Sequence, residues 1–415
     1  MAITTKAATD GSMKGNGTST IPYKRVKTLD HIPATSGALR SLLLLAVAPL
    51  IWASLVLTLA RAFLSNPLGF FRRSRRPARP EEVPLPPPWA QRLAGLQHEM
   101  LDVGGGVRLH AVSFGRRPHL PLLLLLHGFP ECWYSWRHLL AEAREGEGEG
   151  SGEAQGQGQG GGSGWLGGRY EVVALDMRGF GWSSKPEGIS AYSLDALTSD
   201  IAGAVAALGR TSCTLLAHDW GGAVAWAAAG RYPGLVRALG VVAAPHWLLY
   251  RRNLSLQQAV RSSYIVMFQM PILPELLLTH SDAALLETLL LGRAGPASPR
   301  TSGAVTPGDV EVYKAALLQP GCATASLNYY RAVMLASMGV MPFSGEVERG
   351  LRRQLEMPVL VVWGAEDHAL LVSNLKGVAE VAPLSEVHIL PHCSHWVQSD
   401  QPQELSRVVR EWLGE

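Results

Sequence analysis

The sequence predicts an α/β protein: a mostly parallel β-sheet with helices on both faces and a helical cap inserted into the core. Short apolar runs bounded by turn residues alternate with helical stretches, which is typical of strands buried on both faces of a parallel sheet. Near the middle of the chain, one such run passes through a tight turn of small residues into an Ala-rich helical stretch. Helical patterns alone replace this alternation over residues 246–350, which we interpret as the cap.

Length and composition are consistent with one large globular core. The chain has 415 residues, of which 47% are hydrophobic and 17% are charged, and this excludes a disordered protein. The net charge of +3 is a weak signal because many basic residues flank an apolar N-terminal segment. The globular part has no basic patch, so we expect no nucleic-acid partner. Four widely separated cysteines indicate neither a disulfide framework nor a zinc site.

Three segments precede the predicted core. Residues 1–40 are polar, and we expect a disordered tail. Residues 41–61 are predicted to be a transmembrane anchor, because residues 41–60 carry no charge and a helix of this length spans about 30 Å, the thickness of a bilayer core. The segment is too long and too far from the start for a cleaved signal peptide, and a buried core helix is the alternative. Residues 62–95 form an Arg/Pro-rich linker.

The basic residues around this segment indicate its orientation. Six arginines follow it and four basic residues precede it, so the positive-inside rule favours a cytosolic catalytic domain. Two glycosylation sequons begin at Asn16 and Asn253, on opposite sides of the segment. We therefore expect that only one of them is ever modified.

The core is predicted in two parts, residues 96–245 and 351–415, separated by the cap at 246–350. Residues 145–164 consist only of Glu, Gly, Gln, Ser and Ala, and we expect a disordered surface loop there. The expected strands are residues 100–103, 107–113, 122–126, 172–175, 214–216, 239–242, 359–362 and 387–390.

The stretch Leu215–Ala223 has the outline of a nucleophile elbow, a sharp turn from a strand into a helix. Ala217, Gly221 and Gly222 are small because such a turn leaves no room for side chains. Its tip carries Asp219, where a serine hydrolase has Ser. A carboxylate has a pKa of roughly 4 and attacks without a base. Attack on an ester or amide gives a high-energy anhydride, whereas attack on a strained or polarised alkyl carbon gives an ester. The elbow therefore indicates an epoxide or an alkyl halide as substrate.

Two further residues follow in an informative order. Asp367 comes after a buried strand, and His395 lies between the last predicted strand and the C-terminal helix. The order nucleophile, acid, histidine is that of α/β-hydrolases, so we predict that Asp367 orients His395 as the general base. Glu366 is an alternative acid, and His392 and His368 are alternative bases.

Two loops are expected beside the elbow. The segment His127–Pro130 ends an earlier strand, so the backbone N–H groups of Phe129 and Trp220 are predicted to form an oxyanion hole. The segment Asp176–Ser183 is predicted to fix a loop near the site through hydrogen bonds and glycine turns.

These segments together resemble the signature blocks of epoxide hydrolases of the α/β-hydrolase fold. The resemblance covers roughly residue 96 to the C-terminus, and its blocks are His127–Glu131, Asp176–Ser183 and His218–Gly222. The N-terminal apolar segment is similar to the anchor of the membrane-bound members of animals. The segment 145–164 departs from the family pattern, which leaves the conformation of that loop open.

The resemblance extends to the predicted cap. Segments 264–269 and 328–331 are similar to those that supply the family's two catalytic tyrosines. The matching positions are Tyr264 and Tyr330, which would donate protons or hydrogen bonds to the epoxide oxygen, and Tyr329 is the alternative to Tyr330. Phenols suit this role because, with a pKa near 10, they remain protonated at neutral pH.

The resemblance implies hydrolysis of epoxides to vicinal diols through a covalent ester on Asp219. The expected reactants are water and a lipophilic epoxide such as that of a fatty acid, with no metal and no organic cofactor. The expected location is the endoplasmic reticulum membrane, with a role in lipid metabolism. Two alternatives stay open: a dehalogenase that uses the same Asp nucleophile, and a catalytically silent relative that binds lipids or a partner. A halide needs N–H donors and no acid, so paired tyrosines favour the epoxide.

Overall fold

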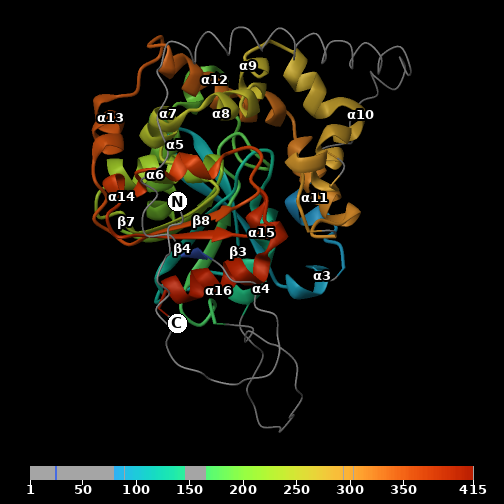
Figure 1. Cartoon of the computed structure of the whole chain (residues 1–415). Helices are drawn as coiled ribbons and strands as arrows, with labels where there is room; N and C mark the ends of the chain where they lie inside the picture. Colours follow the sequence, from blue (N-terminus) through green and yellow to red (C-terminus); the bar gives the residue numbers. More distant parts are fainter. Residues whose placement is uncertain are drawn as a thin grey trace, which may run out of the picture.

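A twisted β-sheet runs through the centre of the protein, with helices on both faces (Figure 1). The computed structural model describes residues 24–25, 79–87, 89–144, 165–292, 294–301 and 303–414. Within these residues the strand order is β1-β9-β8-β7-β6-β4-β5-β3-β2. The six central strands, β4 to β9, pair in parallel with one another. At one edge β1 pairs antiparallel with β9, and at the other β3 pairs antiparallel with β5 and β2. The strands are β1 Lys24–Arg25, β2 Gln97–Gly104, β3 Val107–Ser113, β4 Leu122–Leu126, β5 Glu171–Leu175, β6 Cys213–His218, β7 Val236–Val242, β8 Val359–Gly364 and β9 Ser385–Leu390.

The strands predicted from apolar runs are all present, and several extend beyond those runs. The strand β5 begins at Glu171, a charged residue that is 1% exposed. Its carboxylate forms an ion pair with Arg210 and lies 3.0 Å from Nε of Arg116. Because buried charges require partners, these arginines explain how a carboxylate can occupy a buried strand position.

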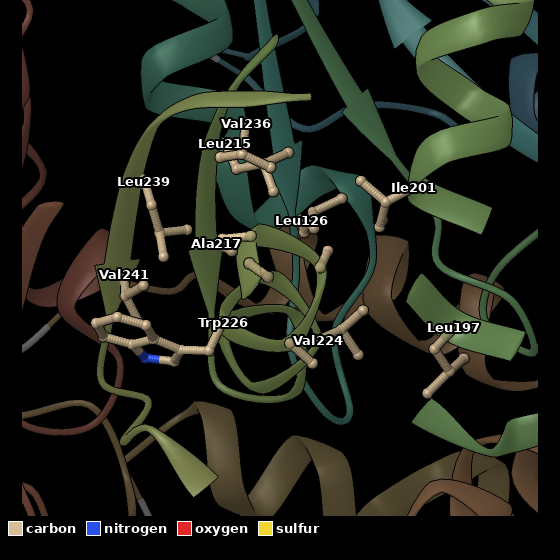
Figure 2. Close-up of a cluster of buried hydrophobic side chains, with 14 of the residues drawn as sticks. Leu126, Leu197, Ile201, Leu215, Ala217, Val224, Trp226, Val236, Leu239 and Val241 are labelled. Atoms are coloured by element: carbon tan, nitrogen blue, oxygen red, sulfur yellow. The ribbon is translucent and has the colours of Figure 1, made fainter. Parts of the chain in front are cut away.

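The core lies on both sides of the sheet because the central strands are apolar at every position. In β4, Leu124 and Leu126 belong to one hydrophobic cluster, and Leu123 and Leu125 belong to the other. This division follows from the alternation of side chains along a strand. Figure 2 shows part of the first cluster, which combines strand residues with residues of two helices that cover that face. The helical residues labelled there are Leu197, Ile201, Val224 and Trp226.

Helices divide between the two faces. One face is covered by α5 (Leu194–Ala207), α6 (Trp220–Arg231) and α13 (Gly345–Arg352), and the other by α4 (Arg137–Ala143) and α16 (Pro402–Trp412). The shorter helices of the core are α3 Trp89–Arg92, α14 Val378–Val381 and α15 Val397–Asp400, with 3₁₀ turns at Pro80–Glu82, Trp133–Trp136, Ile189–Tyr192, Gly295–Ala297 and Val372–Leu375.

The predicted helical cap is present, and in Figure 1 it lies above the sheet and along its right side. Its helices are α7 Trp247–Asn253, α8 Leu256–Arg261, α9 Tyr264–Met267, α10 Leu273–Leu290, α11 Pro307–Leu317 and α12 Cys322–Ser337. The boundary predicted at residue 350 falls inside α13, which packs against α6. A Cβ atom on Gly350 would lie 2.7 Å from the backbone nitrogen of Arg231, so only glycine permits this approach. The helix α13 is therefore part of the core.

The N-terminal predictions fall largely on residues outside those that the structure describes. Within the stretch expected to be a disordered tail, Lys24 and Arg25 form β1 and pair with β9. The predicted anchor at 41–61, most of the linker at 62–95, and the loop at 145–164 lie outside the described residues. In the described parts of the chain, no helix combines the length and the hydropathy that crossing a bilayer requires.

Candidate active site

The predicted elbow lies between β6 and α6, with Asp219 at its tip. Asp219 has φ 48° and ψ −118°, a conformation that costs a non-glycine residue on the order of 1–3 kcal/mol. Its neighbours must be small: a Cβ atom on Gly221 would lie 2.6 Å from the carbonyl oxygen of His127, and one on Gly222 would lie 2.4 Å from Cβ of Ala244. The turn thus projects the carboxylate of Asp219 from the end of a buried strand.

His395 and Asp367 lie beside this carboxylate. The Nε2 atom of His395 is 3.5 Å from Oδ2 of Asp219, and its Nδ1 atom is 2.9 Å from Oδ2 of Asp367. The other oxygen of Asp367 accepts hydrogen bonds from the backbone N–H groups of Ala369 and Leu370, both 2.8 Å long. The three residues predicted from their order in the chain therefore form one contiguous chain of polar contacts.

The alternative acid and bases lie elsewhere. The carboxylate of Glu366 binds the guanidinium of Arg300 and lies 3.3 Å from Nδ1 of His392. The side chain of His392 is 78% exposed, and His368 is also exposed. Adjacent residues at the end of β8 thus point in different directions, and only Asp367 reaches His395.

The charges of Asp219 and His395 depend on each other. Burial alone would raise the pKa of Asp219, but the hydrogen bond and charge of His395 hold it below its ordinary value. Burial alone would lower the pKa of His395, but the charge of Asp367 and the contact with Asp219 raise it well above its ordinary value. The resting site therefore holds an ionised carboxylate next to an imidazolium. If the charge on Asp219 is removed, one of the interactions that raise the pKa of His395 is removed with it.

One backbone N–H of the predicted oxyanion hole donates to the same carboxylate, and the other follows Asp219 in the chain. Phe129 donates its N–H to Oδ1 of Asp219 at 2.9 Å. Trp220 is the first residue of α6, so its N–H is one of the donors that a helix leaves without an intrahelical partner. Gly128 permits the close approach of the two loops, because a Cβ atom there would lie 2.4 Å from Cβ of Asp219.

Asp219 opens onto a cavity of about 420 Å³ between the core and the cap. Tyr264 of α9 and Tyr330 of α12 line this cavity, and their ring centroids are 5.9 Å apart. Burial raises the pKa of both phenols, so both remain protonated across the neutral range. The ring of Trp220 packs edge-on against Tyr330, with centroids 4.9 Å apart. The cavity is therefore lined by the carboxylate of Asp219 and by three tyrosines, Tyr264, Tyr330 and Tyr250, and the hydroxyl of Tyr250 lies 2.9 Å from Oγ of Ser262.

Tyr329 has a different environment from its neighbour. Its hydroxyl donates a hydrogen bond of 2.6 Å to the backbone carbonyl of Arg178, and its ring packs against Phe180. It is fully buried and does not line the cavity. Of the two adjacent tyrosines, Tyr330 is the one that faces Asp219.

A buried polar network behind His395 was not found from the sequence. His218 places Nδ1 2.9 Å from the carboxylate of Glu131 and Nε2 3.0 Å from the backbone carbonyl of His395. Because this Nε2 faces a carbonyl oxygen, it carries the hydrogen. Gln398 donates to the same carboxylate at 3.0 Å. Glu131 and Gln398 are 267 positions apart, so no local pattern indicates that they meet.

The loop predicted to start at Asp176 is held as expected. One carboxylate oxygen accepts the backbone N–H of Trp133 at 2.9 Å, and the other contacts Nδ1 of His110 at 2.8 Å and the N–H of Trp182 at 3.2 Å. Asp176 is fully buried and lies outside the cavity lining. It ties together the loops that follow β4 and β5.

Comparison with known proteins agrees with this geometry. A family model described as the alpha/beta hydrolase fold matches residues 121–261. The chain is 32% identical over 312 residues to Epoxide hydrolase 3 of Mus musculus, covering 74% of each chain. It is 33% identical over 317 residues to Epoxide hydrolase 4 of the same species, covering 75% of this chain and 77% of that protein.

Solved structures show the same similarity. The crystal structure of the Bacillus megaterium epoxide hydrolase in complex with an inhibitor matches with a TM-score of 0.60 and 29% identity, covering 77% of this chain and 100% of that chain. An epoxide hydrolase from an endophytic Streptomyces matches with a TM-score of 0.59 and 26% identity, covering 77% of this chain and 96% of that chain.

The electrostatic role of Asp367 can be measured directly. Asp367→Asn should lower the pKa of His395, because the charge of Asp367 is the largest interaction that raises it. NMR titration of labelled imidazole groups measures this pKa. Glu366→Gln is the matched control, since that carboxylate binds Arg300 and should leave the pKa of His395 unchanged. An unaltered pKa in Asp367→Asn would contradict the assignment.

Proposed function

The chain belongs to the epoxide hydrolases of the α/β-hydrolase fold, and we propose that it converts lipophilic epoxides to vicinal diols through a covalent ester on Asp219. One observation carries the proposal. A single carboxylate at the elbow faces His395 on one side, at 3.5 Å, and shares a cavity with Tyr264 and Tyr330. The proposed nucleophile Asp219 therefore lies next to both the proposed base and the two proposed acids.

In the first step, Oδ2 of Asp219 attacks a carbon of the epoxide ring. The bond from that carbon to the epoxide oxygen breaks, and the oxygen takes its electron pair as an alkoxide. Tyr264 and Tyr330 donate hydrogen bonds to this oxygen, and one of them supplies the proton. A phenol suits the task because its pKa is closer to that of an alkoxide than the pKa of a carboxylic acid is. The product is a hydroxyalkyl ester of Asp219.

In the second step, His395 removes a proton from water. Once the ester has formed, the charge of Asp219 no longer raises the pKa of His395, so His395 transfers the proton that it holds at rest to the tyrosinate left by the first step. The neutral imidazole then accepts the proton of water. The resulting hydroxide attacks the carbonyl carbon of the ester. Negative charge develops on Oδ1, which the N–H groups of Phe129 and Trp220 stabilise. When this intermediate collapses, the bond from the carbonyl carbon to the diol oxygen breaks, and that oxygen takes the proton of the His395 imidazolium. The proton of the new carboxyl group passes to His395, which restores the carboxylate and the imidazolium and releases the diol.

The paired phenols distinguish this reaction from the alternatives. A dehalogenase releases a halide, which needs hydrogen-bond donors but no proton, whereas the opening of an epoxide needs an acid. A catalytically silent relative requires neither an ionised Asp219 nor a histidine held by Asp367. The presence of Tyr264 and Tyr330 beside an intact nucleophile and base supports epoxide hydrolysis.

The cavity supports a lipophilic substrate. Its lining is dominated by apolar side chains of the cap, which exclude water and bind hydrocarbon by the hydrophobic effect. These side chains include Leu254, Ala259, Ile265, Val266, Val333 and Met334. Epoxides of unsaturated fatty acids have the required chemistry, an epoxide ring within a long apolar chain.

The segment 41–61 is proposed to anchor the enzyme in the endoplasmic reticulum membrane, with the catalytic domain in the cytosol. A single crossing would put Lys24 and Arg25 on the opposite side of the membrane from the core, so the proposed anchor and the pairing of β1 with β9 are mutually exclusive arrangements of the chain. Each Leu, Ile or Val at the centre of a membrane helix contributes about 0.3–0.6 kcal/mol to insertion. Residues 41–60 contain eleven Leu, Ile and Val, so these contribute roughly 3–7 kcal/mol to insertion, which outweighs a two-residue strand whose hydrogen bonds contribute about 1 kcal/mol each. The amide of Asn253 donates to the backbone carbonyl of Lys376 at 2.9 Å, which fits a site that no glycan occupies.

The covalent ester can be trapped. His395→Gln should form the ester and then hydrolyse it very slowly, because the base that activates water is missing. Mass spectrometry of the protein after mixing with an epoxide should show an increase equal to the mass of the substrate, located in the peptide that contains Asp219. His392→Gln is the control, and should turn over normally. Normal turnover by His395→Gln would exclude His395 as the base.

The acid role of the tyrosines predicts a contrast between neighbours. Tyr330→Phe and Tyr264→Phe should each slow ester formation by roughly tenfold to a hundredfold, because the alkoxide loses one donor. Tyr329→Phe should leave ester formation unchanged and reduce the free energy of unfolding by about 1 kcal/mol, since it loses only its hydrogen bond to Arg178. Stopped-flow kinetics and chemical denaturation measure the two effects. Equal loss of rate in Tyr330→Phe and Tyr329→Phe would argue against the assignment.

Glycosylation mapping tests the orientation in the membrane. Expression with endoplasmic reticulum membranes should give one glycan, removable by glycosidase, that disappears in Asn16→Gln and persists in Asn253→Gln. Modification at Asn253 would place the core in the lumen. Absence of both glycans would place both flanks in the cytosol, as the pairing of β1 with β9 requires.

A further inference from the structure

Two charged side chains of opposite sign line the substrate cavity. Of the residues that line it, Asp219 and Arg251 alone are charged. Asp219 is the proposed nucleophile, and Arg251 lies on α7 with an exposed side chain. The rest of the lining is mainly hydrocarbon and aromatic. A guanidinium at the edge of such a cavity is available to a ligand that enters it.

The neighbours of Arg251 have other partners, which hold α7 against the core. Arg252 binds the carboxylate of Glu380 at 2.5 Å and the carbonyl of Lys376 at 3.0 Å. Asn253 donates to the same carbonyl at 2.9 Å. Within the described part of the chain, the side chain of Arg251 makes no hydrogen bond or ion pair. The end of α7 is therefore fixed by two residues, and the third presents a free cation to the cavity.

We propose that Arg251 is a specificity-determining residue that binds an anionic group, a carboxylate, at the end of the substrate chain remote from the epoxide. This inference rests on the proposed function, because it requires that the epoxide lie at Asp219. The planar guanidinium of Arg251 donates two parallel hydrogen bonds to a carboxylate. The substrate class is thus epoxides of long-chain carboxylic acids in preference to their neutral esters.

The two charges also set the direction in which such a substrate binds. The carboxylate of Asp219 repels the acidic end of the substrate, and Arg251 attracts it. Apolar residues such as Leu254 and Met334 contact the chain between these ends. The reversed orientation would put two carboxylates together in a largely apolar space and leave Arg251 unpaired, so the acid is bound with its epoxide toward Asp219.

The test compares an epoxide of an unsaturated C18 fatty acid with its methyl ester, which has the same chain and no charge. The variants are Arg251→Gln, Arg251→Lys and the control Arg252→Gln, all in the detergent-solubilised full chain. The readout is the ratio of kcat/KM for the acid to kcat/KM for the ester, each relative to wild type, so that differences in how the two substrates partition into micelles cancel.

Arg251→Gln should lower this ratio about fivefold to tenfold, through KM for the acid with kcat unchanged, because uniform binding energy is lost. Arg251→Lys should retain part of the preference, and high salt should reduce the preference of the wild type. Arg252→Gln should leave the ratio unchanged, since Arg252 binds Glu380.

Four outcomes would overturn the inference. An unchanged ratio in Arg251→Gln, with both substrates converted to diols, would remove Arg251 as a carboxylate site and leave the proposed function standing. Equal losses for acid and ester, or an equal fall of the ratio in Arg252→Gln, would show that the effect comes from the packing of α7. Conversion of neither substrate by wild type would overturn the proposed function together with the inference.

Discussion

The conformation of Asp219 is the constraint on which the rest of the site depends. A residue with a side chain adopts φ 48° at the end of a buried strand only if its surroundings fix it there. In the parallel sheet, the backbone N–H of Asp219 donates a hydrogen bond of 3.1 Å to the carbonyl of Val242. The small residues Gly221 and Gly222 allow α6 to begin directly after Asp219. The strain is offset by burial of β4 and β6, whose central side chains are inaccessible to solvent. The fold thus holds a carboxylate at a point where backbone N–H groups, a histidine and the cap converge.

The electrostatics of the site follow from that placement. A carboxylate at the elbow needs no base to become a nucleophile, so the histidine can serve the later step alone. While Asp219 is charged, it raises the pKa of His395 and stabilises the imidazolium; this stabilisation is lost when Asp219 becomes an ester. Asp367, buried and bound by two backbone N–H groups, stays beside His395 throughout. The same pair of residues therefore has one charge state suited to attack on carbon and another suited to activation of water.

The fold and much of the site follow from local patterns. The strand β4 is apolar at every position because both faces of the sheet are covered, and such a run is legible in the sequence. The order of Asp219, Asp367 and His395 is equally legible, since each follows a strand that ends at the same edge of the sheet. Contacts between distant segments cannot be predicted from local sequence patterns. The partner of Glu171 lies 39 positions away, and the pairing of Glu131 with Gln398 depends on two loops meeting in space. The direction in which a side chain points also cannot be predicted from the sequence. Glu366 and Asp367 are adjacent acids, and the turn after β8 decides which one faces His395.

Single-turnover hydrolysis in oxygen-18 water, with enzyme in excess over a fatty-acid epoxide, tests the covalent route most directly. If water attacks the carbonyl carbon of an Asp219 ester, the label enters the peptide that contains Asp219, and the diol from the first turnover is unlabelled. If water instead opens the epoxide directly, the first diol carries the label and the peptide carries none. The first result is the one that the geometry around Asp219 predicts, and the second would contradict it.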